Sequence, residues 1–216
     1  MKVLFVLACF MFGGAFCSSK LDSNHYVDHL LQVPYPQYVR ALGLTSISLT
    51  SFQLKVKKTS ISNRDFKAEF HNGKLTQPTL SRLGDCSAPG WQGTNVTLGC
   101  YLSLSSLRVA YNGTAKGDSI LATNKSIDVT AFFIGSKAFL EVTSAPGSVP
   151  TVKTWSVLPF STQLFFSKKL DLNKSRQDAF ELEVKRNVAS STLSALYGGI
   201  YHALSSAVGV TKIPLP

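Results

Sequence analysis

The chain has 216 residues, a length that suits one domain with a packed core. It contains 22 Lys and Arg residues against 12 Asp and Glu residues, a formal net charge of +10. This excess favours anionic partners such as glycosaminoglycans, lipid headgroups or bacterial envelope lipids. The sequence shows no internal repeat and no low-complexity tract, which argues against a repeat architecture.

The first residues are typical of a secretory signal. Lys2 precedes an apolar run over residues 3–12, and Ala15 and Cys17 occupy positions that signal peptidase accepts. The run is too short to cross about 30 Å of hydrocarbon as an anchor. We therefore predict a signal peptide over residues 1–17 and a single secreted, extracellular domain over residues 18–216. An extracellular location argues against nucleic acid as a partner.

Residues 21–43 form a short helical or irregular lead-in, interrupted by Pro34 and Pro36. Hydrophobic alternation with a period of two then predicts strands over residues 47–56, with a bulge at Thr50-Ser51, and from Phe66 onward. The second strand runs into Asn72-Gly73. Because Asn-Gly is the strongest short hairpin signal, a hairpin turn is predicted there.

Positive charge is concentrated between residues 55 and 82, where Asp65 and Glu69 are the only acids. The cluster is either a solvated sheet face or a binding surface for an anionic lipid surface or glycosaminoglycan. The cations singled out as a basic surface are Lys55, Lys57, Lys58, Arg64 and Lys67, and Lys74 and Arg82 extend the cluster.

Removal of the signal leaves two cysteines, Cys86 and Cys100. A secreted chain with two cysteines has one possible connectivity, so a Cys86–Cys100 disulfide is predicted. Closing a loop of about 15 residues stabilises the fold by roughly 3 kcal/mol in the chain-entropy model. Four Asn-X-Ser/Thr sequons predict glycosylation and mark surface positions: Asn95, Asn112, Asn124 and Asn173.

Residues 96–111 alternate over 16 positions, which predicts one strand of roughly 50 Å. Another alternating run, over residues 127–133, turns at Gly135-Ser136 into a strand over 138–142. Residues 152–166 are aromatic and β-branched but contain Pro159, so we expect one edge strand with a bend.

The pattern changes to helical from Asn173 or Ser175 to Ala207, about 50 Å at 1.5 Å per residue. Residues 187–211 contain no charged residue, so this part of the helix is expected to be enclosed by protein or lipid. A helical wheel predicts an apolar face formed by Leu182, Ala189, Leu193, Leu196, Ile200, Ala203, Leu204 and Ala207.

The helix matches the long strand in length. This predicts an α+β fold in which a long, curved antiparallel sheet is wrapped around a long C-terminal helix. Such an arrangement, carried by the alternating runs over 52–56 and 96–102 and by the helix over 193–204, resembles the tubular lipid-binding superfamily. That superfamily includes bactericidal/permeability-increasing protein, the insect juvenile-hormone-binding and takeout proteins and the group-seven mite allergens, which the element order resembles most.

The resemblance implies a secreted protein that binds an apolar small molecule or lipid in a cavity between helix and sheet. The insect carriers have a disulfide near the N-terminus, whereas this chain has its cysteines in mid-chain. The candidate cavity-lining residues are Val96, Leu98, Leu102, Leu104, Leu193, Leu196, Ile200 and Leu204. These residues either line an open cavity or fill it completely. Small residues such as Gly198 and Gly199 either leave room or allow close packing.

The alternative is a secreted effector or antibacterial protein that binds host protein, polyanion or bacterial envelope lipid through its basic surface. We predict no enzyme activity and no cofactor. Gly117-Asp118-Ser119-Ile120 resembles GDS-type esterases in those letters alone, and no late Asp-x-x-His supplies a base. His202 is expected to be packed or lumen-facing. His25, Asp28 and His29 lack a further ligand, so no metal site is predicted, and the serines of the last helix argue against a membrane span.

Overall fold

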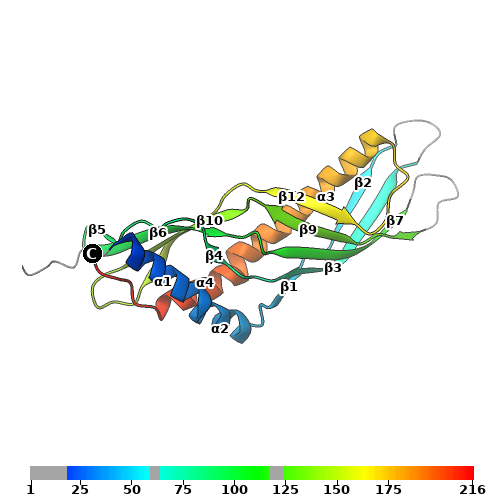
Figure 1. Ribbon diagram of the computed structural model, residues 1–216. Coiled ribbons are helices and arrows are strands. Elements are labelled where there is room, and N and C mark those ends of the chain that lie inside the picture. Colours follow the sequence, from blue (N-terminus) through cyan, green and yellow to red (C-terminus); the bar gives the residue numbers. More distant parts are fainter. Residues whose placement is uncertain (1–18, 59–63, 117–123) are drawn as a thin grey trace, which may run out of the picture.

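The computed structural model describes residues 19–58, 64–116 and 124–216. Two helices lie near one end of the molecule, two antiparallel sheets follow one another along the long axis, and a long C-terminal helix extends along both (Figure 1). The α+β architecture with a long curved sheet and a long C-terminal helix is therefore confirmed.

The N-terminal segment is more regular than its prolines indicate. Helix α1 (Lys20–Gln32) begins with a capping box, in which the Ser19 side chain accepts a backbone N–H and Asp22 bonds back to the Ser19 backbone. Helix α2 (Pro34–Ala41) follows after a break at Val33, with Pro34 at a first-turn position that lacks an intrahelical partner in any case. Both prolines are thus compatible with helix.

The strands form two separate sheets, and the chain passes back and forth between them. The first sheet has the order β1-β3-β7-β9-β12, with β2 paired to β3 and β8 to β7. The second has the order β11-β10-β6-β4, with β5 paired to β6. Strands of the first sheet are β1 (Ser46–Leu49), β2 (Phe52–Val56), β3 (Phe66–Thr76), β7 (Arg108–Lys116), β8 (Lys125–Ser126), β9 (Val129–Ile134) and β12 (Ser161–Phe166). Strands of the second are β4 (Ser81–Arg82), β5 (Gly90–Gln92), β6 (Asn95–Ser103), β10 (Lys137–Ser144) and β11 (Thr151–Val157).

The chain passes from one sheet to the other at four places, which we call the strand crossings: residues 77–80, 104–107, 135–136 and 158–160. The crossings lie side by side. The Leu104 N–H donates to the Ser136 carbonyl at 3.0 Å, the Leu158 N–H donates to the Lys137 carbonyl at 2.9 Å, and the Ser106 hydroxyl donates to the Thr79 carbonyl at 2.7 Å. The two sheets therefore form one curved layer that bends along this line.

The predicted single strand over 96–111 is wrong, because β6 and β7 belong to different sheets. Leu104 and Leu107 are both buried although they are three residues apart, so the slip in alternation marks a crossing. The same holds for residues 152–166, which form β11 and β12 rather than one bent strand. Each of these two strands lies at the edge of its own sheet, as the edge prediction requires.

The predicted hairpin at Asn72-Gly73 is also wrong. Strand β3 continues through these residues, and its register with β7 shifts between His71 and Lys74, which is a bulge. Asn72 takes a positive φ of 53°, a conformation that Asn tolerates better than most residues. The long-range pairing with β7 on both sides of the bulge overrides the local turn signal.

The C-terminal helix is confirmed and consists of α3 (Lys174–Ala195), a π-helical turn η1 (Leu196–Ile200) and α4 (Tyr201–Gly209). Helix α3 packs against β1, β2 and β12 of the first sheet, and α4 packs against β11 of the second and against α2. One helix therefore covers both halves of the curved layer.

The helix buries every fourth residue from Arg176 to Val208. At 100° per residue, four residues rotate by 400°, so this buried stripe follows an inclined ridge and winds around the helix. The predicted face is therefore wrong in its first half: Leu182 is 48% exposed and Leu193 is only half-buried. The residues buried there instead are Phe180, Val184, Val188 and Thr192.

Close contacts between the first sheet and α3 depend on one glycine. Gly113 of β7 faces the core, where Phe66 and Phe70 pack against Phe180 with ring centroids 5.5 Å and 6.3 Å apart. A Cβ atom on Gly113 would lie 2.6 Å from the Phe70 ring and 2.7 Å from the Ile127 carbonyl oxygen. The backbone oxygen cannot move away as a flexible side chain would.

We expect Gly113→Ala to lower the free energy of unfolding by about 1–3 kcal/mol, the usual cost of an overpacked core. The substitution retains the sequon at Asn112. Urea unfolding followed by circular dichroism measures the effect. Gly198→Ala is the matched control, because its Cβ would meet nothing within 4 Å. Equal stability of the two variants would contradict this role of Gly113.

Candidate functional site

The residues predicted to line a cavity lie in the core between the C-terminal helix and the second sheet. Seven of the eight are at most 1% exposed, and Leu193 is half-buried. None of them lines any of the three surface hollows described below. Their role in ligand binding stays a prediction. At Gly199, which was expected either to leave room or to allow close packing, the Leu44 side chain packs where a Cβ would stand.

An apolar hollow lies instead between the N-terminal helices and a strand crossing. We call it the α2 pocket; its volume is about 450 Å³, within the usual range for small-molecule sites. Its walls come from α1, α2, the segment after α2 and the crossing at residues 77–80. The lining residues are Leu31, Tyr35, Pro36, Val39, Arg40, Thr45, Gln77, Pro78, Thr79 and Leu80.

The α2 pocket is held by a hydrogen bond between its two walls. The buried Tyr35 hydroxyl donates to the Pro78 carbonyl at 2.7 Å, and burial raises the pKa of Tyr35, which keeps the hydroxyl protonated as a donor. Gln77 takes a positive φ of 56°, an uncommon conformation for a residue with a side chain. Arg40 is exposed and is the charged residue of the lining. The pocket thus combines apolar walls with one cation.

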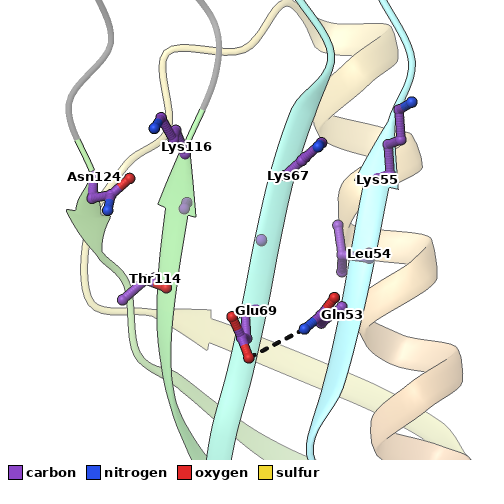
Figure 2. Close-up of a pocket in the computed structure, with 10 residues that line it drawn as sticks. Gln53, Leu54, Lys55, Lys67, Glu69, Thr114, Lys116 and Asn124 are labelled. Carbon is purple, nitrogen blue, oxygen red and sulfur yellow. Dashed lines mark hydrogen bonds between the residues drawn. The ribbon is translucent and has the colours of Figure 1, made fainter.

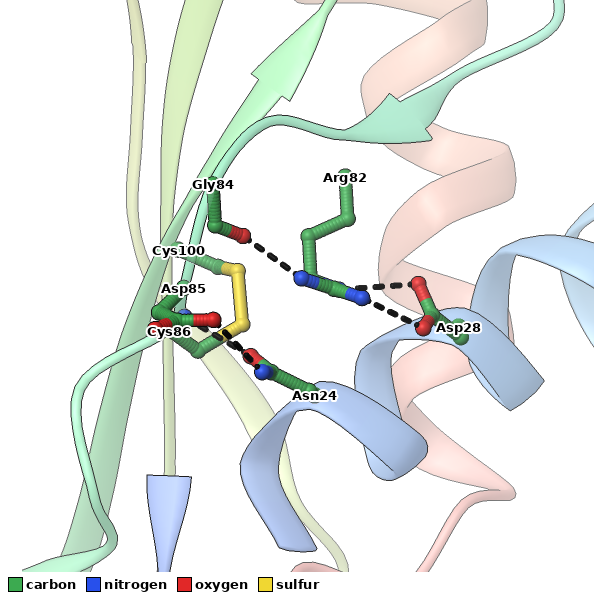
Figure 3. A network of polar contacts seen from close by, with 7 residues as sticks. All are labelled: Asn24, Asp28, Arg82, Gly84, Asp85, Cys86 and Cys100. Atoms are coloured by element: carbon green, nitrogen blue, oxygen red, sulfur yellow. Dashed lines mark hydrogen bonds and ion pairs between the residues drawn. A yellow bond between two sulfur atoms is a disulfide. The ribbon is translucent and has the colours of Figure 1, made fainter. Parts of the chain in front are cut away.

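Helix α1 is fixed to the second sheet beside the disulfide, as Figure 3 shows. The Asn24 side chain accepts from the Cys86 N–H at 2.8 Å and donates to the Asp85 carboxylate at 3.0 Å. The Cys86–Cys100 bond is present, which confirms the prediction. These contacts hold the helix that contributes Leu31 to the α2 pocket.

A second anchor of α1 uses a cation that the sequence assigned to the basic cluster. Arg82 binds both carboxylate oxygens of Asp28, at 2.9 Å and 2.8 Å, and donates to the Gly84 carbonyl at 2.6 Å. The hydrogen bond to Asp28 raises the pKa of Arg82 further above its ordinary value. Arg82 is therefore a structural ion-pair partner, and the Asp28 carboxylate is engaged by it.

The basic-surface residues of the sequence analysis lie at one end of the first sheet, and all five are exposed: Lys55, Lys57, Lys58, Arg64 and Lys67. Lys55 forms an ion pair with Asp65 at 2.7 Å, and the Lys58 N–H also donates to Asp65. The hydrogen bond from Lys55 and that from the Lys58 backbone lower the pKa of Asp65.

Lys55 and Lys67 border a polar hollow of about 490 Å³ on the outer face of the first sheet, drawn in Figure 2. Lys116 of β7 joins them there. Sequence reasoning missed Lys116, because its position beside Lys67 depends on the β3–β7 pairing. A further hollow of about 630 Å³ lies on the same sheet around the β3 bulge and includes Lys74 and Asn112.

The sequons occupy surface positions with local partners. Asn112, Asn124 and Asn173 are exposed, and Asn95 is half-buried in β6. The Asn112 side-chain amide donates to Asp128 at 3.2 Å, and the Asn173 side chain caps α3 by accepting from the Arg176 N–H at 3.0 Å. Glycosylation at these sites stays a prediction.

Within the described ranges, no group of three His, Cys, Asp or Glu residues is placed to hold a metal ion. His202 is exposed, so its expected packed or lumen-facing position is wrong. The Gly117-Asp118-Ser119-Ile120 segment lies outside the described residues. None of the described helices is long and apolar enough to span a membrane.

The sequence and the fold were compared with those of known proteins. No family model matches the chain. It is 24% identical over 200 residues to the salivary anticoagulant protein P23 of Ixodes scapularis, covering 90% of this chain and 89% of that protein. A crystal structure of lipopolysaccharide binding protein matches with a TM-score of 0.40 and 14% identity. The match covers 88% of this chain and 40% of that protein, so the chain spans less than half of it.

The long curved antiparallel layer and the long C-terminal helix are the elements that the resemblance to the tubular lipid-binding superfamily implied. The salivary relative and the disulfide point to an extracellular protein of arthropod type. The comparisons name no ligand for this chain.

We expect Asn24→Ala to lower the free energy of unfolding by about 1–3 kcal/mol, because it leaves the buried Cys86 N–H without its acceptor. Urea unfolding provides the measurement. Gln32→Ala, an exposed amide on the same helix, serves as the control and should change stability little. An unchanged unfolding midpoint for Asn24→Ala would show that α1 is not anchored in this way.

Proposed function

We propose that this chain is a secreted protein that binds a small amphipathic molecule in the α2 pocket. The apolar body of the ligand contacts Leu31, Val39 and Leu80, and its anionic head lies near Arg40. The observation that carries the proposal is the composition of the pocket, whose lining is mainly apolar and contains one cation and no acid. The proposed binding site therefore lies at the border of the helix–sheet core, whereas the sequence prediction placed the ligand inside that core.

Burial of apolar ligand surface supplies the binding energy, at about 25 cal/mol per Å² before the costs of association. The pocket is suited to this role because its walls are fixed in advance, by the Tyr35–Pro78 hydrogen bond on one side and by the anchors of α1 on the other. Among the described residues, the lining contains no His, Cys, Asp or Glu, so binding without chemistry is proposed. The absence of enzyme activity remains part of this proposal.

Fluorescence titration with dansyl-labelled undecanoic acid tests the proposal. We expect Arg40→Glu to weaken binding of the acid at least tenfold, because an attraction to the carboxylate becomes a repulsion. The methyl ester of the same probe should bind both forms equally. Arg40 is exposed, so this variant should fold normally.

Lys168→Glu is the matched control, since it makes the same charge change at an exposed site outside the pocket. Val39→Trp should reduce binding of both probes by filling the pocket. Unchanged binding of both probes by the folded Arg40→Glu and Val39→Trp variants would reject the pocket. Native mass spectrometry of the secreted chain, followed by solvent extraction, would identify a co-purified ligand.

A second candidate function is that of a secreted effector acting on host blood proteins. The observation that favours it is the similarity to a salivary anticoagulant protein over nearly the full length of both chains. We expect the purified chain to prolong plasma clotting time in proportion to its concentration. The reduced and alkylated chain is the control. A clotting time that stays constant at micromolar protein would reject this candidate.

A further inference from the structure

Three lysines lie in one row across three adjacent strands of the first sheet. Lys55 of β2 is directly opposite Lys67 of β3, and Lys67 is directly opposite Lys116 of β7. Residues that face each other in this way point to the same side of a sheet. Their neighbours Leu54, Ala68 and Ala115 are buried against the core, so the lysines point outward, as Figure 2 shows. We call this set the lysine row.

The lysine row is unfavourable for the fold by itself. Neighbouring strands are about 4.8 Å apart, and like charges directly opposite each other destabilise a sheet. Lys55 is compensated by Asp65 at 2.7 Å. Within the described part of the chain, Lys67 and Lys116 have no ion pair. The next row contains Glu69, whose carboxylate accepts from the Gln53 amide at 3.2 Å.

The surface around the lysine row is concave and polar. The hollow of about 490 Å³ is lined by outward side chains that donate or accept hydrogen bonds, among them Gln53, Thr114 and Asn124. More cations stand at the same end of the sheet, with Lys57 and Lys58 after β2 and Arg64 before β3. The hollow therefore offers positive charge together with groups that pair with hydroxyls.

We propose that the lysine row binds an anionic polysaccharide, whose sulfate or carboxylate groups lie on Lys67 and Lys116 and whose hydroxyls contact the polar side chains. A lipid surface fits less well, because none of the exposed large hydrophobic residues in the described ranges lines this hollow. The exposed Phe132, Ile134 and Phe165 lie on β9 and β12 instead. This site is separate from the α2 pocket and does not depend on ligand binding there.

The test measures binding of a heparin-derived dodecasaccharide to the secreted full chain by isothermal titration calorimetry. We expect binding that weakens as NaCl increases, because salt screens exposed charges. Lys67→Gln/Lys116→Gln should weaken binding at least tenfold in 50 mM NaCl. Lys20→Gln/Lys212→Gln is the matched control, with the same loss of charge at exposed positions on α1 and after α4, and should stay within twofold.

Thermal unfolding of the same variants provides a second readout. Removal of two uncompensated charges from the row should leave the melting temperature unchanged or raise it at low salt, while binding is lost. If the double variant does not fold, Lys116→Gln alone, at the end of the row, should weaken binding at least threefold. Equal losses in the row variant and the control would assign binding to net charge and overturn the proposal.

Two further comparisons test the source of the anionic charge and the accessibility of the site. Vesicles containing 20% phosphatidylserine should not bind at salt concentrations where the dodecasaccharide binds; binding to vesicles alone would overturn the proposal. Asn124 lies at the hollow and belongs to a sequon, so Asn124→Gln is measured beside the unmodified chain. Both should bind the dodecasaccharide. Binding by Asn124→Gln alone would show that the site is covered in the secreted protein.

Discussion

Burial of the winding stripe along the C-terminal helix is the constraint on which the rest of the structure depends. The buried stripe extends over 33 residues, about 50 Å, whereas the longest strand, the 11-residue β3, spans roughly 36 Å. Two sheets joined at the strand crossings are therefore needed to cover it. The π-helical turn is fixed near this junction, where the Leu196 carbonyl accepts from the Trp155 indole at 3.2 Å and the Tyr197 hydroxyl accepts from the Val157 N–H at 3.0 Å.

The parts of the fold that follow from local patterns could be predicted from the sequence. The helix and most strand positions follow from the spacing of apolar residues along the chain. The disulfide follows from the two cysteines that remain after the signal. The crossing at residues 104–107 could not be predicted, because alternation continues through it after a slip of one residue. The Asn72-Gly73 signal gave a wrong turn because pairing with β7, about 40 residues away in the chain, decides the conformation there.

The candidate sites could not be predicted from the sequence either, because they depend on contacts between segments that are far apart in the chain. The α2 pocket is formed by residues near 31–45 and 77–80, which are separated by three strands, and Arg40 has no local pattern that marks it. The lysine row depends on the register of β2, β3 and β7. The charge count located Lys55 and Lys67 but not their arrangement, and it included Arg82, whose carboxylate partner comes from α1.

In the first sheet, the side chains that pack against the helix point inward, and the side chains proposed to bind a polyanion point outward. Ala68 and Ala115 point inward on the same strands whose next residues, Lys67 and Lys116, point outward. A change in the outward row therefore leaves the packing against α3 intact. The inward positions have no such freedom, since Phe70 already occupies the space beside Gly113. Selection for a new polyanion or a new charge pattern can thus act on the outer face of this sheet while the core that holds the helix stays the same.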